Sequence, residues 1–237
     1  MYDYKEGKRR LQEIINNNLK IEDSKEIPTD ENFTYENAYY GWVSAIFVDI
    51  RNSTQLFTNQ NQEAVSKVIR CFSSEIIEIL RIPNEIREIG IRGDCVYAIY
   101  NTPLKQNIQD VLALAITVNT FLTMLNQMLR NKSLPTIKAG IGAASAEELV
   151  VKAGRKGVGI NNAVWIGKAV TYASALSSQA NKGNIRPIAV SDLMFKNLLD
   201  GTIKNQFLSA TCIPVGNFYH AEIFDNKFQE WIQGGMR

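Results

Sequence analysis

The chain is poor in the residues that build several common kinds of active site. Among its 237 residues it has one histidine, His220, and three cysteines, with no pair at the CxxC spacing. A lone histidine cannot form a histidine-rich metal site and gives little support to Ser-His or Cys-His catalysis. Three scattered cysteines favour reduced thiols over a disulfide framework. We therefore expect His220 to be a structural or surface residue and any chemistry to depend on other side chains.

A strong charge bias and long apolar runs are also missing. The 26 basic and 24 acidic residues leave a formal net charge of +2, so composition gives no argument for nucleic acid or an anionic membrane as a partner. No apolar run approaches the roughly 20 residues that a membrane span needs. The charged N-terminal segment lacks the apolar core of a signal peptide. We expect a cytoplasmic protein that binds neither nucleic acid nor membrane.

The spacing of apolar residues divides the chain into an N-terminal extension, residues 1–35, and one larger domain, residues 36–237. The extension is rich in Lys, Glu and Asn, and residues 11–21 predict a short amphipathic helix. The domain alternates apolar runs of strand length with longer runs at helical spacing. In order, its predicted elements are a strand at residues 42–50, a helix capped by Ser53 or Thr54, a hairpin at residues 84–100, a helix at residues 108–129, two strands within residues 137–154 joined by residues 143–148, a helix at residues 165–180, and two or three further strands with a short helix from residue 187.

This order of elements predicts an α+β fold. It describes a ferredoxin-like βαββαβ unit with extra C-terminal strands, in which helices cover one face of a mostly antiparallel sheet. In such a sheet the first strand lies in the centre, beside the strand that completes the hairpin. Residues at matching ends of these two strands are therefore expected to converge.

Two acidic residues stand at such matching ends. Asp49 ends the apolar run AIFVDI, and Asp94 begins the second strand of the hairpin, after Arg92 and Gly93. Two buried carboxylates that lie close together need a cation to stay ionised. Carboxylates, with water or phosphate completing the shell, suit Mg²⁺ or Mn²⁺, and pairs of such ions serve phosphoryl chemistry. The spacing alone leaves a second interpretation open, in which Asp49 caps the following helix and Asp94 is an ordinary turn residue.

Four stretches in this order carry a resemblance to a known family: FVDIRNST, RGDCVYAIY, KAGIGAASAEELVVKAGRKG and WIGKAVTYASAL. Over about residues 40–225 the chain resembles the catalytic domain of the class III nucleotidyl cyclases. The resemblance implies a head-to-tail homodimer with active sites at its interface, where a nucleoside triphosphate becomes a 3′,5′-cyclic monophosphate and diphosphate. It also implies that two Mn²⁺ or Mg²⁺ ions are held by Asp49, Asp94 and the backbone carbonyl of Ile50, and that the substrate-binding positions include Lys138, at the phosphates, and Thr171.

The chain departs from the family at positions that contact the base and the transition state. A lysine of adenylate cyclases falls on Gly90, and an Asp or Thr falls on Val164, so neither purine-contacting group is present. The family's transition-state arginine falls on Ala175. Among nearby cations, Arg51 and Lys168 are expected to be solvated surface groups.

A narrower resemblance fits these departures. The stretches VKAGRKG, GINNAVWIGKAV and ASALSS resemble the bacterial pyrimidine cyclases of the Pycsar anti-phage system. Those proteins make cyclic UMP or cyclic CMP, which activates a separate effector. The resemblance implies a cytosolic enzyme that is linked to its effector only through its product.

A pyrimidine pocket must be smaller than a purine pocket, and we expect Phe47, Trp165 and Arg92 to close it and to contact a base carbonyl. Since a guanidinium offers only donors, it suits uracil better than cytosine, so UTP is the predicted substrate and CTP the alternative. Two other hypotheses stay open. One is a purine cyclase with a different pocket, and the other is an inactive, nucleotide-binding regulatory module, which Ala175 favours.

Overall fold

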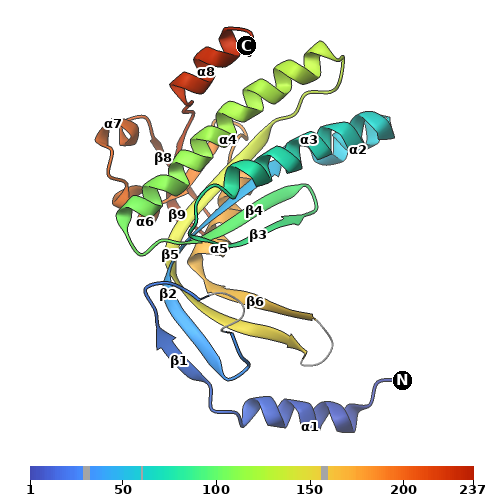
Figure 1. Cartoon of the computed structure of the whole chain (residues 1–237), viewed down its shortest axis with the longest axis vertical. Helices are drawn as coiled ribbons and strands as arrows, with labels where there is room; N and C mark the ends of the chain where they lie inside the picture. Colours follow the sequence, from blue (N-terminus) through green and yellow to red (C-terminus); the bar gives the residue numbers. More distant parts are fainter. Residues whose placement is uncertain (29–32, 60, 156–159) are drawn as a thin grey trace.

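The structure, a computed structural model, describes residues 1–28, 33–59, 61–155 and 160–237. Within them nine strands form one sheet, in which seven follow the order β3-β4-β2-β5-β7-β9-β8, while β1 pairs with β2 and β6 pairs with β5 (Figure 1). The strands are β1 (Lys20–Asp23), β2 (Asn37–Ile50), β3 (Ile86–Arg92), β4 (Cys95–Asn101), β5 (Ala139–Arg155), β6 (Ile160–Gly167), β7 (Ile188–Ser191), β8 (Leu208–Cys212) and β9 (Gly216–Ala221). The helices are α1 (Tyr4–Ile15), α2 (Ser53–Asn59), α3 (Gln62–Leu80), α4 (Lys105–Asn131), α5 (Lys168–Gln179), α6 (Asp192–Asn197), α7 (Gly201–Lys204) and α8 (Asn226–Gln233).

The predicted α+β fold is confirmed, with β2 as the central strand between β4 and β5, antiparallel to both. Because side chains alternate along a strand, Ile46 and Val48 pack with α3 and α4, whereas Ala45 and Phe47 pack on the opposite face with α5. Asp49 continues the second series, so its side chain belongs to the face of α5.

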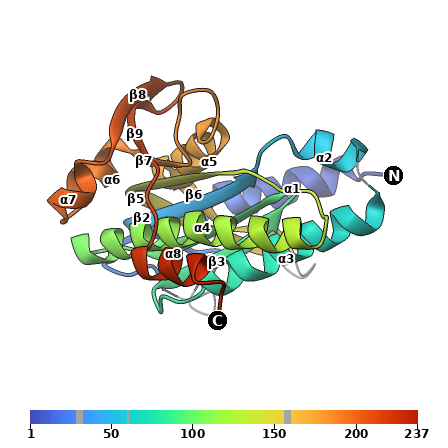
Figure 2. The same cartoon turned by 90° about the horizontal axis from the view of Figure 1, so that it is seen from above.

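The sequence predicted that the helices cover one face of the sheet, and this prediction was wrong because helices lie on both faces. Figure 2 shows α3 and α4 on one side of the sheet and α5 on the other. Helix α5 approaches β5 so closely that a Cβ at Gly142 would collide with backbone atoms of Ala173 and Ser177. A glycine at this position therefore allows α5 to rest directly on the sheet, beside the end of β2.

Strand β5 differs from the prediction of two strands joined by residues 143–148. It is one strand of 17 residues, and residues 143–148 pair with β2 without interruption, from Ile46 opposite Ala143 to Gly41 opposite Glu148. The stretch AASAEE contains no Gly, Pro or Asn to form a turn. Strand β5 continues to Arg155, and residues 156–159 lie outside the described residues.

The segment after β2 also differs from the prediction. Ser53 and Thr54 lie inside a separate short helix, α2, rather than capping the long one. Helix α3 is capped by Asn61, whose side chain accepts a hydrogen bond of 2.7 Å from the backbone N–H of Ala64.

The N-terminal segment contributes to the sheet and the core. The predicted helix begins earlier than expected, at Tyr4, and ends at Ile15. Strand β1 pairs in parallel with β2, and Ile27 and Phe33 are buried in the cluster on the face of α5. The division into an extension and a catalytic domain at residue 35 stays a prediction.

Helix α4 is, within the described residues, the one helix long and apolar enough to cross a membrane by length and composition. In its most apolar window 67% of the residues are buried in the protein, as expected for a core helix. His220, on β9, is also buried, and its Nδ1 accepts a hydrogen bond of 3.1 Å from the backbone N–H of Arg186. Burial lowers the pKa of this imidazole, so the neutral form is favoured and the predicted structural role agrees with the contacts.

Candidate active site

The strand register brings the two predicted acids to the same end of the sheet. Asp49 pairs with Cys95 across β2 and β4, and Asp94 precedes Cys95 in the β3–β4 turn. Ile50 follows Asp49 as the last residue of β2, and Asp94 directly precedes the first residue of β4. The backbone N–H of Arg51 points toward β5, where it donates to the carbonyl of Lys138 at 2.7 Å. Because backbone groups alternate in direction along a strand, the carbonyl of Ile50 points the opposite way, toward β4. The carboxylates of Asp49 and Asp94 and the carbonyl of Ile50 therefore lie at one corner of the sheet, which we call the acid corner.

Electrostatics also links the two acids. The pKa of Asp49 is raised, first by burial; the charge of Arg51 opposes this rise, and the charge of Asp94 adds to it. The charge of Lys182 also opposes the rise, but the pKa of Asp49 stays above its ordinary value. An additional cation beside Asp49 would therefore favour the ionised form of that carboxyl group.

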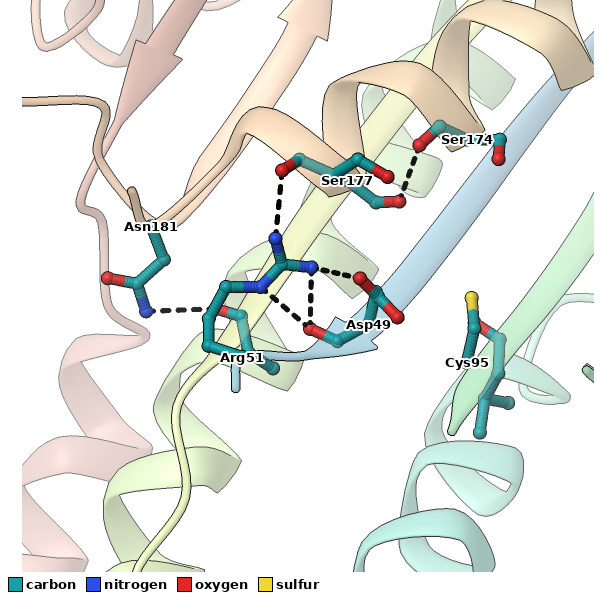
Figure 3. A network of polar contacts seen from close by, with 9 residues as sticks. Asp49, Arg51, Cys95, Ser174, Ser177 and Asn181 are labelled. Carbon is teal, nitrogen blue, oxygen red and sulfur yellow. Dashed lines mark hydrogen bonds and ion pairs between the residues drawn. The ribbon is translucent and has the colours of Figure 1, made fainter. Parts of the chain in front are cut away.

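Arg51 is a structural residue, and its prediction as a surface cation was wrong. Its side chain is 5% exposed, and its guanidinium contacts the carboxylate of Asp49. It also donates to the backbone carbonyls of Asp49, at 3.1 Å, and of Ser178, at 2.9 Å (Figure 3). Arg51 therefore ties the end of β2 to the end of α5.

Further polar contacts fix this corner. The side chain of Asn181, just after α5, donates to the carbonyl of Ala139 on β5 at 2.9 Å, as Figure 3 shows. Cys95 lies beside the acids, and burial together with the charges of Asp49 and Asp94 raises the pKa of its thiol to about 12. The thiol stays protonated at neutral pH and is not a thiolate ligand for a metal.

The residues present fit a hard divalent cation. The described part of the chain contains no group of three or more His, Cys, Asp and Glu side chains suited to a metal ion. Asp49, Asp94 and the Ile50 carbonyl would supply few protein ligands, and water or phosphate oxygens would complete the shell, as Mg²⁺ and Mn²⁺ accept. The Asp49 side chain is 26% exposed, and Arg51 contacts only its Oδ2. Its Oδ1 faces no hydrogen-bond donor among the described residues, which leaves that oxygen open to a cation.

An aromatic pair lies next to the acids on the same face. Phe47, two residues before Asp49, is buried and pairs with Tyr97 across β2 and β4, with ring centroids 5.1 Å apart and planes at 15°. Tyr97 in turn lies over Gly90 of β3, where a Cβ would come within 2.8 Å of its ring and hydroxyl. The ring of Tyr97 thus occupies the space above Gly90, the position at which the resemblance implies a base-contacting lysine in adenylate cyclases.

Glu88, an acidic residue that was not predicted from the sequence, connects Tyr97 of β4 with Trp165 of β6. Glu88 accepts a hydrogen bond of 2.6 Å from the hydroxyl of Tyr97 and one of 2.7 Å from Nε1 of Trp165. The indole of Trp165 comes from β6, which is not a neighbour of β3 in the sheet. The available signal was the alternation of Glu88, Gly90 and Arg92, which places all three on one face of β3.

The remaining predicted residues lie around this region. Arg92 is exposed at the end of β3, near enough for its charge to oppose the raised pKa of Tyr97, which burial and Glu88 lift to about 12. Lys138 is exposed and lines a cavity of about 290 Å³ together with Arg51. Thr171 is exposed on α5 and donates its hydroxyl to the carbonyl of Gly167 at 3.0 Å. Within one chain, these contacts do not bring Thr171 to the acids.

A second buried acid was not predicted. Glu148 is fully buried, and one of its oxygens accepts a hydrogen bond from the backbone N–H of Ala169 at the start of α5. Its Oε2 has no hydrogen-bond partner among the described residues. Burial raises the pKa of Glu148 to about 7, against the backbone donors of Ala169 and Val170. A Cβ at Gly167 would collide with this carboxyl group, so the glycine makes room for the acid.

Comparison with known proteins places this site in a family. The family model described as the adenylate and guanylate cyclase catalytic domain matches residues 35–209. The chain belongs to this family. The class III cyclase membership inferred from the four motifs is thereby confirmed.

Individual relatives narrow the comparison. The uridylate cyclase of Treponema porcinum is 50% identical over 235 residues, which cover 99% of this chain and 82% of that protein. The uridylate cyclase of Gulbenkiania mobilis is 30% identical over 188 residues, 76% of this chain and 73% of that protein. Among solved structures, the adenylyl cyclase CyaB from P. aeruginosa superimposes with a TM-score of 0.64 at 20% identity, covering 77% of this chain and 94% of that one. That likeness shows the cyclase fold.

Proposed function

We propose that this cyclase converts UTP into 3′,5′-cyclic UMP and diphosphate. The observation that carries the proposal is the 50% identity, over almost the whole chain, to a protein named uridylate cyclase. Two features of the site support it. Gly90 and Val164 replace the purine-contacting residues, and the ring of Tyr97 fills the space above Gly90.

The acid corner explains how the chain would promote this reaction. Asp49, Asp94 and the Ile50 carbonyl would hold two Mn²⁺ or Mg²⁺ ions, which supply positive charge for the triphosphate and for the attacking oxygen. The ribose 3′-oxygen bonds to the α-phosphorus, the bond from that phosphorus to the β-phosphate oxygen breaks, and diphosphate leaves with the electron pair. The 3′-hydroxyl proton passes to solvent. Lys138 would bind the phosphates, so the contribution of the chain is positioning and charge neutralisation.

The proposed enzyme acts as a head-to-tail homodimer. Each active site would combine the acids of one protomer with the β6 and α5 segment, including Thr171, of the other. Exposed apolar side chains on the two hairpins support such an interface, since Ile91 is 54% exposed and Ile166 50% exposed. These side chains flank Arg92 and Trp165, which were predicted to contact the substrate.

The proposed setting is bacterial anti-phage defence in the cytoplasm. The product would activate a separate effector, and the enzyme itself would need neither nucleic acid nor membrane. One observation favours a second candidate function. Ala175 stands where the family has its transition-state arginine, and this favours a weakly active or inactive module that binds nucleotide for regulation.

Initial rates with ATP, GTP, CTP and UTP, each with Mn²⁺ and with products identified by mass, test the proposal. We expect cyclic UMP to form fastest. Faster turnover of CTP would instead establish a cytidylate cyclase, and turnover of a purine nucleotide but neither pyrimidine would overturn the base assignment. Nucleotide binding without any turnover, unchanged by Asp94→Ala, would establish the regulatory module.

A further inference from the structure

Glu88 is held by donors from two other strands. Its carboxylate accepts from the Tyr97 hydroxyl of β4 and from the Trp165 indole of β6. Strands β3 and β6 are separated in the sheet by β4, β2 and β5, so the contact with Trp165 joins segments that the backbone ladder does not. The sheet is curved enough for β3 and β6 to meet at the side chain of Glu88.

The surroundings of Glu88 fix the direction of its carboxylate. The ring of Tyr97 is stacked on buried Phe47 and pressed over Gly90, where a side chain would displace it. Glu88, Tyr97 and Trp165 are all half-buried, so the cluster has a solvent-facing side. A carboxylate can accept about four hydrogen bonds, and the two donors use two of them. Glu88 therefore presents spare acceptor capacity, without a donor of its own, beside Trp165 of β6, the segment that is proposed to complete the site formed by the acids of the other protomer.

The bases of UTP and CTP differ at the atom that such an acceptor would meet. Uracil has an N3–H donor between two carbonyl oxygens, whereas the N3 of cytosine is an acceptor. A carboxylate facing N3 would accept from uracil and would repel the lone pair of cytosine. Because the single donor hydrogens of Tyr97 and Trp165 are already used by Glu88, the guanidinium of Arg92 is the nearby donor that suits a carbonyl flanking N3 in uracil.

We infer that Glu88 is a specificity-determining residue that accepts the N3–H of uracil and thereby selects UTP over CTP. This inference rests on the proposed function and deepens it. Arg92, which the sequence singled out for base selection, would then have a supporting role at a base carbonyl. In this proposal the carboxylate of Glu88, held by Tyr97 and Trp165, selects the base. No lysine at position 90 is needed.

The substitution Glu88→Gln tests the inference because it converts half of the acceptor into a donor. The amide N–H of glutamine can donate to cytosine N3, while its oxygen can accept from the cytosine amino group. We expect the ratio of kcat/KM for UTP to kcat/KM for CTP to fall at least about tenfold. The ratio is measured within each variant, so a smaller folded fraction lowers both rates and leaves the ratio unchanged. Glu75→Gln, the same charge change at an exposed position on α3, is the matched control and should leave the ratio unchanged.

A modified substrate tests the same contact in the native enzyme. UTP methylated at N3 lacks the donor, and we expect its kcat/KM to fall at least about 100-fold relative to UTP. UTP methylated at C5 keeps N3–H and should retain most of the activity. Equal turnover of the two analogues would show that N3–H is not contacted and would overturn the inference.

The outcomes separate failure of this inference from failure of the proposed function. If the native enzyme prefers UTP and Glu88→Gln leaves the ratio within about twofold, Glu88 does not select the base and the inference fails alone. If the native enzyme turns over neither pyrimidine nucleotide, the proposed function fails and the inference fails with it. If Glu88→Gln is inactive with every nucleotide, Tyr97→Phe decides. This change removes one donor that holds Glu88, so a lowered ratio supports the inference and an unchanged ratio overturns it.

Discussion

The buried guanidinium of Arg51 contacts the carboxylate of Asp49, two residues earlier at the end of β2. The same guanidinium donates to the carbonyl of Ser178 at the end of α5. One of the acids on which the proposed chemistry depends is therefore oriented by a cation that also holds the fold together. The contact leaves Oδ1 of Asp49 available, so a structural ion pair and a metal ligand are compatible in one side chain.

Replacing this cation is expected to destabilise the protein. Arg51→Ala leaves Asp49 without its ion pair and Ser178 without its donor, and we expect the free energy of unfolding to fall by about 2–4 kcal/mol. Urea denaturation measures the change. Arg81→Ala is the matched control, because Arg81 forms an exposed ion pair with Glu78 and should cost less than about 1 kcal/mol. Equal losses in the two variants would show that Arg51 is not the structural residue described.

Asp94 should be needed for activity and not for folding. It lies in a turn and is half-buried, and Asp94→Asn keeps its shape while removing the charge that a divalent ion needs. We expect kcat/KM with Mn²⁺ to fall at least about 100-fold while the melting temperature stays unchanged. Asp110→Asn on α4 makes the same chemical change outside the acid corner and should keep full activity. An active Asp94→Asn variant would remove the acid pair from the mechanism.

Glu148 should make stability depend on pH. Its pKa is about 7 in the folded protein against an ordinary value of 4.5, so between these values the folded state keeps a proton that the unfolded state releases. The free energy of unfolding should therefore fall as pH rises from about 4.5 to 7, by roughly 3 kcal/mol at most. Glu148→Gln keeps the acceptor for Ala169 without titrating. Denaturation curves at pH 5 and pH 8 should thus differ less for this variant than for the native protein, and an identical pH slope would contradict the assignment.

The shared site should be visible by mixing two inactive variants. Asp94→Asn removes an acid, and Trp165→Ala removes a residue proposed to act on the other side of the interface. In a mixture of equal amounts, half of the dimers combine the two variants and each has one intact site, so activity should return to about a quarter of the native value. A mixture no more active than its components would place all these residues in one protomer's site.

The sequence predicted the central features of the site because they depend on local pattern and strand order. A buried run ending in Asp49 and a hairpin whose second strand begins at Asp94 suffice to place both acids at one end of adjacent strands, once β2 is known to be central. Phe47 was predicted as an aromatic residue close to the acids, and alternation along β2 explains why it lies on the same face as Asp49. The βαββαβ order followed from the lengths and periods of the apolar runs.

Other features depend on contacts between distant segments. The bond between Glu88 and Trp165 needs the curvature of the sheet, which strand periodicity does not contain. Burial of Arg51 needs the C-terminal end of α5 to lie over β2, and no pattern around residue 51 indicates it. The length of β5 was predictable in part, since residues 143–148 contain no Gly, Pro, Asn or Asp.

Anomalous diffraction tests most directly whether Asp49 and Asp94 hold divalent ions under a triphosphate. Crystals would be grown with Mn²⁺ and a UTP analogue that cannot cyclise. We expect manganese peaks about 2.1 Å from carboxylate oxygens of both residues, with the phosphates on the other side of the ions. Peaks confined to other parts of the molecule, or two carboxylates that contact no metal while the nucleotide is bound, would contradict it.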